Sequence, residues 1–413
     1  WTDHPGTLEL LHETAFEDPA DTCRATALEQ LPTHWADHPN TLELIRSRVT
    51  QDPDEDVRSS ALRMMATHWT DHPGTLELLH ETAFEDPADT CRATALEQLA
   101  THWADHPNTK SLMTSRAIED LGYHPRSVAF GHLAARYPAH SDTLRILYER
   151  ALNDPDGYAR GVALELLAVH SLNQDSLVDF IQKRAIEDSD DHCRGSALRI
   201  LAANWSERPE ILNFIRGRAI ADTDDHCRSS ALRMLATYWR DLPETLDFLR
   251  DRAVNSQTRG PRGASLELLA THWRDETGIV DLMCDRATQD GSEEIRESAF
   301  ALLAGHWHDR HEVIVTSHEI FSNDPSPERR LNALQVLSAG KDAAGAKDAA
   351  ICAMKDSSSL VRKGAIKILT FSCGEDLDTR NLLRDLADAD SDESVRAEAR
   401  GALSVTGLAT GLQ

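Results

Sequence analysis

An aspartate followed six residues later by an arginine recurs along the chain. A single such pair could combine a general acid or base with a cation that stabilises an anion. A pair that returns in nearly every segment cannot be an active site each time. Because the guanidinium group is planar and carries five donors, we expect a ladder of buried or half-buried Asp–Arg hydrogen bonds between adjacent segments. The clearest pairs are Asp18 and Arg24, Asp52 and Arg58, Asp188 and Arg194, and Asp222 and Arg228.

Histidines are the second group of residues that could do chemistry. A metal site needs several ligands that converge on one point, whereas these histidines are spread over successive turns, so we expect them to be solvated. Four His-Glu dipeptides resemble those of di-iron hydroxylases, but two are copies of one duplicated segment and two share a helix. No G-x-x-x-x-G-K-[ST], G-x-S-x-G or H-E-x-x-H motif occurs. We therefore predict no enzyme activity, no catalytic residue, no metal and no cofactor. The dipeptides begin at His12, His80, His311 and His318.

A period of 34 residues organises the whole chain. All eight tryptophans lie on it, and Tyr137 and Ser171 fill the two gaps in their series. Arginine keeps the same period ten times, from Arg24 to Arg330. Such a period is typical of a solenoid. The tryptophans stand at 1, 35, 69, 103, 205, 239, 273 and 307.

Each period predicts two helices. Apolar residues at Leu8, Leu11 and Ala15 follow a Pro-x-Thr start and form one helical face. After a short acidic loop, a second apolar face begins near Val57 in the second repeat. Because such short helices cannot bury their apolar faces alone, each pair must stack on its neighbours. We predict an all-α solenoid of about 24 helices over residues 1–413, in twelve units that start at 1, 35, 69, 103, 137, 171, 205, 239, 273, 307, 339 and 373.

Composition restricts the partners. The net charge of −26 argues against a nucleic-acid surface and favours a protein or an uncharged ligand. Seven cysteines without a C-x-x-C pair suggest reduced thiols and a cytoplasmic location. Neither a membrane span nor a signal peptide is visible. Because the chain opens on Trp1 inside the repeat pattern, we expect it to be part of a longer polypeptide.

The second helices carry a candidate site for a protein partner. An apolar row runs along them from Leu166 to Val336, and arginines flank it. The simpler interpretation is packing between units. The functional interpretation is a concave strip that receives a partner, because apolar centres with arginine at the edge are typical of binding hot spots. The candidate residues are Leu166, Arg199, Ile200, Arg233, Met234, Leu268 and Leu302.

Two loops break the repeat pattern and are candidates for hinges or contacts. They span 120–125 and 255–261, and the second lacks the loop aspartate. The phrase Asp-x5-Arg-x-x-Ala-Leu-x-x-Leu at 222–235 resembles HEAT repeats, whose second helices line a concave face. Tetratricopeptide repeats share the period, but their Gly, Tyr and Ala-x3-Phe positions do not recur here.

A narrower resemblance concerns residues 235–253, which read Leu-Ala-Thr-Tyr-Trp-Arg-Asp-Leu-Pro-Glu-Thr-Leu-Asp-Phe-Leu-Arg-Asp-Arg-Ala. This phrase looks like the C-terminal repeat region of bacterial NACHT-type (STAND) signal-transduction ATPases. The resemblance implies a ligand-sensing arm of a larger bacterial protein with a role in antiviral defence. A general interaction scaffold and a HEAT-like repeat enzyme such as a bilin lyase are the alternatives.

Overall fold

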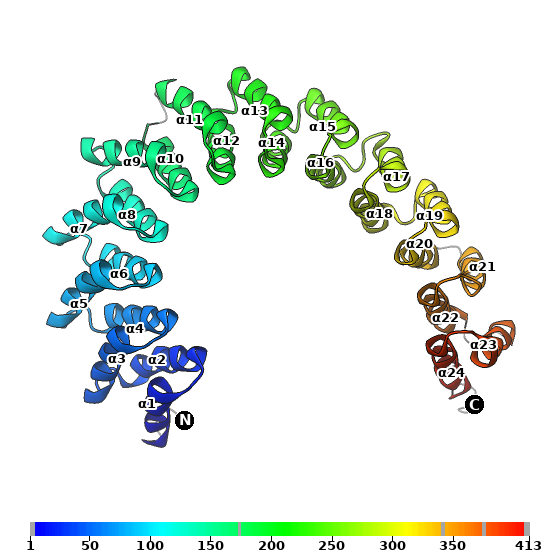
Figure 1. Ribbon diagram of the computed structural model, residues 1–413, viewed down its shortest axis with the longest axis horizontal. Coiled ribbons are helices and arrows are strands. Elements are labelled where there is room, and N and C mark those ends of the chain that lie inside the picture. Colours follow the sequence, from blue (N-terminus) through cyan, green and yellow to red (C-terminus); the bar gives the residue numbers. More distant parts are fainter. Residues whose placement is uncertain (1–4, 172–174, 340–342, 374–376, 409–413) are drawn as a thin grey trace. The chain divides into compact units, whose positions relative to one another are not determined.

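The computed structural model describes residues 5–171, 175–339, 343–373 and 377–408. These residues form 24 α-helices and no strand. The predicted all-α fold is therefore confirmed. The chain divides into two compact units, residues 1–215 and 216–413. Within each of them, consecutive helices pack as hairpins (Figure 1).

The helices follow the 34-residue period. The first compact unit contains α1 (Pro5–Glu17), α2 (Asp21–Trp35), α3 (Pro39–Gln51), α4 (Glu55–His68), α5 (Pro73–Glu85), α6 (Asp89–His102), α7 (Pro107–Glu119), α8 (Tyr123–Arg136), α9 (Ser141–Asn153), α10 (Gly157–Ser171), α11 (Asp175–Glu187) and α12 (Asp191–Trp205). Helix α13 (Pro209–Ala221) contains the division between the two compact units. The second contains α14 (Asp225–Tyr238), α15 (Pro243–Asn255), α16 (Arg259–His272), α17 (Ile279–Gln289), α18 (Glu293–Trp307), α19 (His311–Asn323), α20 (Pro327–Ala339), α21 (Ala343–Ala353), α22 (Ser359–Cys373), α23 (Leu377–Ala389) and α24 (Glu393–Leu408).

The acidic loop inside each hairpin ends one helix and starts the next. In the second repeat, the N–H of Asp52 donates to the Arg48 carbonyl at the end of α3. The Asp54 carboxylate then accepts hydrogen bonds from the N–H groups of Asp56 and Val57 and caps α4. Asp52 and Asp54 therefore have different roles, and the Asp52 carboxylate accepts hydrogen bonds from Arg24 of the preceding repeat.

Where a repeat begins with Pro-x-Thr, this start joins it to the repeat before. Pro73 occupies the first turn of α5, where a missing N–H costs little. The hydroxyl of the buried Thr75 donates to the carbonyl of Trp69 at 2.7 Å. The ring Nδ1 of His72 accepts the Gly74 N–H. The turn between units is thus held by side chains that recur with the period.

The core of each compact unit is a stack of small and branched apolar side chains. On first helices, Ile45, Leu79 and Met113 have no exposed surface. On second helices, Leu62 and Leu96 are equally buried. The tryptophans Trp69 and Trp239 stand at the C-caps of α4 and α14, in the turns between units where the period predicts them. Trp35 is the last residue of α2.

Candidate functional site

The Asp–Arg spacing produces a ladder that links adjacent repeats. Arg58 donates from Nε and Nη2 to the two carboxylate oxygens of Asp86, at 3.0 Å each. Its third nitrogen, Nη1, donates to the backbone carbonyl of Asp52. Within a repeat, the arginine therefore contacts the backbone carbonyl of the aspartate six residues before it. Its contact with a carboxylate is made to the aspartate of the next repeat. The same arrangement holds Arg24, Arg92, Arg126, Arg160, Arg262, Arg330 and Arg362.

Five loop carboxylates also lie near a second arginine, four residues earlier on the first helix. Arg48 lies 3.8 Å from Asp52, and Arg286 lies 3.7 Å from Asp290. Where the bond to the ladder arginine is strong, it lowers the pKa of the carboxyl: hydrogen bonds from Arg330 hold the pKa of Asp356 below its usual value. Two guanidinium groups around one carboxylate are thus a recurring arrangement of this fold.

The ladder is interrupted at Arg228. The residue 28 positions further on is Ser256. A short hydroxyl side chain therefore stands where the other ladder arginines have their aspartate partner. Arg228 donates instead to Asp225 of its own helix and to the Thr258 hydroxyl at 3.1 Å, and it also contacts the Asp222 carbonyl. The Asp222–Arg228 pair is therefore joined through the backbone, like the others.

A second interruption lies between α18 and α20. The repeat period predicts that the Asp324 carboxylate pairs with Arg296. Instead, this carboxylate accepts a 2.7 Å hydrogen bond from Nε of Arg329 in its own repeat. Arg296 donates to the backbone carbonyl of Asp290. Arg329 also donates from Nη2 to the carbonyl of Ala287, at the end of α17. Its side chain is only 2% exposed, and Nη1 is buried without a hydrogen-bond partner.

Arg329 occupies a position that is apolar in neighbouring repeats. Ile295 and Val57 stand at the equivalent positions, and both are buried. A long cation at this point draws Asp324 out of the ladder, and α18 and α20 pack less closely than other neighbouring second helices. Sequence reasoning missed this residue. The available signal was a charge in an otherwise apolar column.

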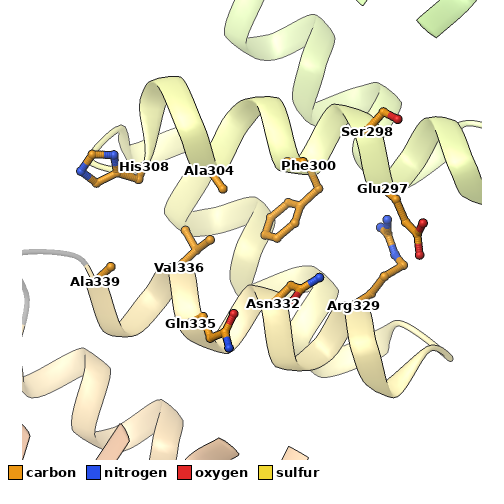
Figure 2. A pocket seen from close by; sticks show the side chains of 11 residues that line it. Glu297, Ser298, Phe300, Ala304, His308, Arg329, Asn332, Gln335, Val336 and Ala339 are labelled. Carbon is orange, nitrogen blue, oxygen red and sulfur yellow. The ribbon is translucent and has the colours of Figure 1, made fainter. Parts of the chain in front are cut away.

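A cavity of about 830 Å³ lies between α18 and α20, and Arg329 is in its wall. Figure 2 shows the ring of Phe300 inside it, opposite Val336, with Arg329 and Glu297 at one end and His308 at the other. The volume lies within the range of small-molecule and peptide-anchor pockets. Its wall is mainly apolar. The buried Arg329 in this wall has one nitrogen, Nη1, without a hydrogen-bond partner. The remaining lining residues include Ser298, Ala301, Ala304, Asn332, Gln335 and Ala339.

The residues of the sequence-predicted row differ in exposure. In the first compact unit, Leu166 is half-buried and Ile200 is 2% exposed, so Ile200 belongs to the packing. Arg199 is exposed and donates to both oxygens of Glu165 at 3.1 Å, as expected for opposite charges on adjacent second helices.

In the second compact unit the row leads to the cavity. Met234, Leu268 and Leu302 are half-buried. Arg233 is exposed and lines a separate polar cavity of about 390 Å³. The row ends at Val336 in the wall of the 830 Å³ cavity.

The column of charges beside the row changes at the cavity. It carries Arg233 on α14 and Glu267 on α16, then becomes uncharged at Ala301 and Gln335. Both uncharged residues line the cavity. The mainly apolar cavity between α18 and α20 therefore coincides with the loss of the flanking charges.

Cysteines and histidines are used structurally. The six cysteines whose side chains the structure describes are free thiols. Burial and the neighbouring Asp188 raise the pKa of Cys193 to about 12, so this thiol is not a nucleophile at neutral pH. His12 and His80 have lowered pKa values, first because of burial. His34, His68, His102, His272 and His306 are exposed, and His4 lies outside the described residues.

One group in the described part of the chain could hold a cation: the adjacent Asp190, Asp191 and His192. Asp190 already caps α12, because its carboxylate accepts the N–H groups of His192 and Cys193. No helix in the described ranges combines the length and the apolar character that a membrane crossing requires.

One comparison with known proteins identifies the repeat in two parts of the chain. The family model for HEAT repeats matches residues 8–100 and 316–404. The described residues form an all-α solenoid, and these two parts of it match the HEAT-repeat model. No curated protein matches this chain.

Several solved structures match most of this chain at low sequence identity. Yeast importin-beta (Kap95p) is 15% identical, with a TM-score of 0.47 over 97% of this chain and 61% of that one. Kap121p bound to RanGTP is 15% identical, with a TM-score of 0.46 over 97% of this chain and 44% of that one. An engineered protein is 14% identical, with a TM-score of 0.34 over 97% and 98% of the two chains. The chain spans about half the length of the Kap121p structures. At this identity the likeness concerns the fold alone.

Proposed function

We propose that this chain is a non-catalytic, cytoplasmic HEAT-repeat region that binds a protein partner along its second helices. The observation that carries the proposal is the 830 Å³ cavity between α18 and α20, at the end of the apolar row. Phe300 and Val336 offer an apolar surface, and buried Arg329 offers a hydrogen-bond donor. An apolar anchor surrounded by polar contacts is the usual form of a binding hot spot.

Charge defines the partner further. The chain carries 69 acidic against 43 basic residues, so a protein segment with basic flanks is attracted and nucleic acid is repelled. We infer an amphipathic segment whose apolar side chain enters the cavity and whose basic residues face the acidic surface. This is helix-in-groove recognition, in which a few spaced anchors supply the affinity.

Two matched substitutions test the cavity. Ala301→Glu places a charge at an exposed position of α18 in the cavity wall. Gly131→Glu places the same charge in the same column on α8, where an added Cβ would have no neighbour within 4 Å. The probe is a displayed library of amphipathic helical peptides with Leu or Met anchors and Lys or Arg flanks.

The library should enrich peptides that bind the unmodified chain. Their affinity should fall at least about tenfold with Ala301→Glu, which corresponds to about 1.4 kcal/mol, and stay within about twofold with Gly131→Glu. If nothing is enriched, or if Ala301→Glu leaves the affinity unchanged, the cavity is not the anchor site.

The rest of the row is tested separately. Met234→Glu combined with Leu268→Glu changes two half-buried residues on α14 and α16. Helicity and melting temperature are measured first. If both are retained, weaker binding of the enriched peptides would support a row that extends to α14, and unchanged binding would restrict the site to the cavity.

We further propose that the partner or ligand regulates a larger bacterial protein, as in the sensor arm of a NACHT-type (STAND) ATPase with a role in antiviral defence. The support is the repeat phrase at 235–253. Regulation requires that the ligand bind two curvatures of the solenoid with different affinity, since equal affinity shifts no equilibrium.

The gene context tests this version. A P-loop ATPase encoded in frame upstream, with nucleotide hydrolysis that changes when the cavity peptide binds, would support it. An ATPase whose activity ignores the peptide, or the lack of an ATPase, would leave a general interaction scaffold. Covalent transfer of a bilin chromophore by the chain would instead identify the bilin-lyase alternative and overturn the non-catalytic proposal.

A further inference from the structure

Two arginines lie near the loop after α15, and both lack the aspartate with which such arginines pair in other repeats. In several repeats, one loop aspartate pairs with the ladder arginine of the preceding repeat and with the arginine four residues earlier on its own first helix, as Asp52, Asp120 and Asp188 do. Asp290 shows this arrangement: Arg262 donates to both of its oxygens at 3.0 and 3.1 Å, and Arg286 lies 3.7 Å away. At position 256 the residue is serine. The arginines that would share an aspartate there are Arg228 and Arg252.

Their present carboxylate partners are local and exposed, and Arg228 also donates to the Asp222 carbonyl and the Thr258 hydroxyl. Arg228 contacts Asp225, three residues earlier on α14, and Arg252 contacts the adjacent Asp251. The carboxylate side chains of Asp225 and Asp251 are 39% and 45% exposed, whereas that of Asp290 is 3% exposed. Exposed pairs contribute little, because water and salt screen them. Both guanidinium groups can therefore change partner at small cost.

A cavity lies where the carboxylate would be. It has a volume of about 330 Å³, and both Arg228 and Arg252 line it, together with Asn255, Ser256 and Thr258. In complete loops, the aspartate also accepts the N–H two residues further on, as Asp290 accepts that of Ser292 at 2.9 Å. The equivalent N–H belongs to Thr258. The site thus provides two guanidinium groups and a backbone donor arranged as for an aspartate side chain.

We propose that this cavity binds a carboxylate from outside the chain, held by Arg228 and Arg252 in the manner in which Arg262 and Arg286 hold Asp290. The fork of a guanidinium group matches the two oxygens of a carboxylate. The volume is at the small end of ligand pockets, which suits a free small carboxylic acid or a single acidic side chain of a peptide. This site lies at the hairpin loops and is independent of the cavity between α18 and α20.

Chemical rescue tests the proposal on the full chain. Sodium acetate should raise the melting temperature of the unmodified chain by at least about 2 °C at saturation, relative to sodium chloride at equal ionic strength. Ser256→Asp should raise the melting temperature without acetate and abolish the response, because the new side chain fills the site. Asp290→Ser recreates the same arrangement around Arg262 and Arg286, so it should lower the melting temperature and gain an acetate response.

The source of the carboxylate is distinguished by a second probe, N-acetyl-Gly-Asp-Gly-amide. Binding of this peptide that is at least tenfold tighter than that of acetate, and is lost in Ser256→Asp, would support an acidic peptide as the ligand. Binding of acetate alone would support a free small carboxylic acid. The proposal is overturned if Ser256→Asp responds to acetate as the unmodified chain does, or if Asp290→Ser responds and the unmodified chain does not.

Discussion

At the scale of the residue, the molecule depends on the geometry of arginine more than on its charge. Arg126 illustrates this: its side chain is 3% exposed, it donates to both oxygens of Asp154, and it also donates to the carbonyls of Asp120 and Leu121. Lysine has the same charge but a single nitrogen, so it cannot replace these four contacts.

We therefore expect Arg126→Lys to lower the free energy of unfolding by about 1.5–3 kcal/mol, the range for hydrogen bonds to charged groups. Urea unfolding measures the change. The control is Arg145→Lys, because Arg145 is 64% exposed and pairs only with exposed acids at the surface; it should change stability by less than about 0.5 kcal/mol. Equal effects of the two changes would show that the fork is unimportant.

The ladder also predicts how stability depends on pH. The hydrogen bonds from Arg330 lower the pKa of Asp356 in the folded chain. A lowered carboxyl pKa stabilises the fold above the unfolded value of about 4, and this contribution is lost as the pH falls through the folded value. The stability difference between the unmodified chain and Asp356→Asn should thus be constant above about pH 5 and shrink below pH 4.

Thermal unfolding between pH 7 and pH 3 measures this difference. Asp241→Asn is the control, because Asp241 is 98% exposed and its removal should have little effect at any pH. A difference that stays constant down to pH 3 would contradict the assignment of Asp356 to the ladder.

At the scale of the element, a single arginine decides how two helices approach each other. Arg329 and Arg330 are adjacent on α20 but have opposite consequences. Arg330 completes a rung with Asp356, whereas Arg329 takes Asp324 from the rung that Arg296 would form. The cavity between α18 and α20 follows from this competition.

We expect Arg329→Val, which restores the apolar residue of the other repeats, to let Asp324 pair with Arg296 and to draw α18 and α20 together. Stability should be unchanged or higher by up to about 4 kcal/mol, because an apolar residue replaces a buried ion. Arg330→Val should instead cost about 3–5 kcal/mol, because it leaves Asp356 without its cation. Urea unfolding and a crystal structure of Arg329→Val check both outcomes. A widened cavity with reduced stability would contradict this account.

At the scale of the whole molecule, stability is shared between neighbours. Each hairpin packs only on the hairpins next to it, so a local loss should spread by contact. Leu232 has no exposed surface on α14, and truncation of a buried leucine costs about 2–5 kcal/mol. After Leu232→Ala, amide hydrogen exchange should accelerate in α14 and α16 before α22 and α24. Mass spectrometry of exchanging peptides would show this order, and uniform acceleration over residues 216–413 would contradict it.

The sequence by itself determined the fold class, because a period that repeats in tryptophan, arginine and apolar residues allows only stacked helix pairs to bury their faces. It also indicated the pairing of Asp with Arg and the irregular loop at 255–261. Tertiary structure decided which aspartate each arginine reaches: the carboxylate partner of Arg58 is Asp86, 28 residues away, and not the nearer Asp52.

The candidate sites also required tertiary structure. The sequence shows that the row at Met234 and Leu268 is apolar. Only the packing shows that Ile200 of this row is buried and that the cavity lies beside Val336. The physical reason is that a cavity depends on the distance between helices. That distance is set by competition among side chains for one partner, such as Arg296 and Arg329 for Asp324, and the period alone does not record its outcome.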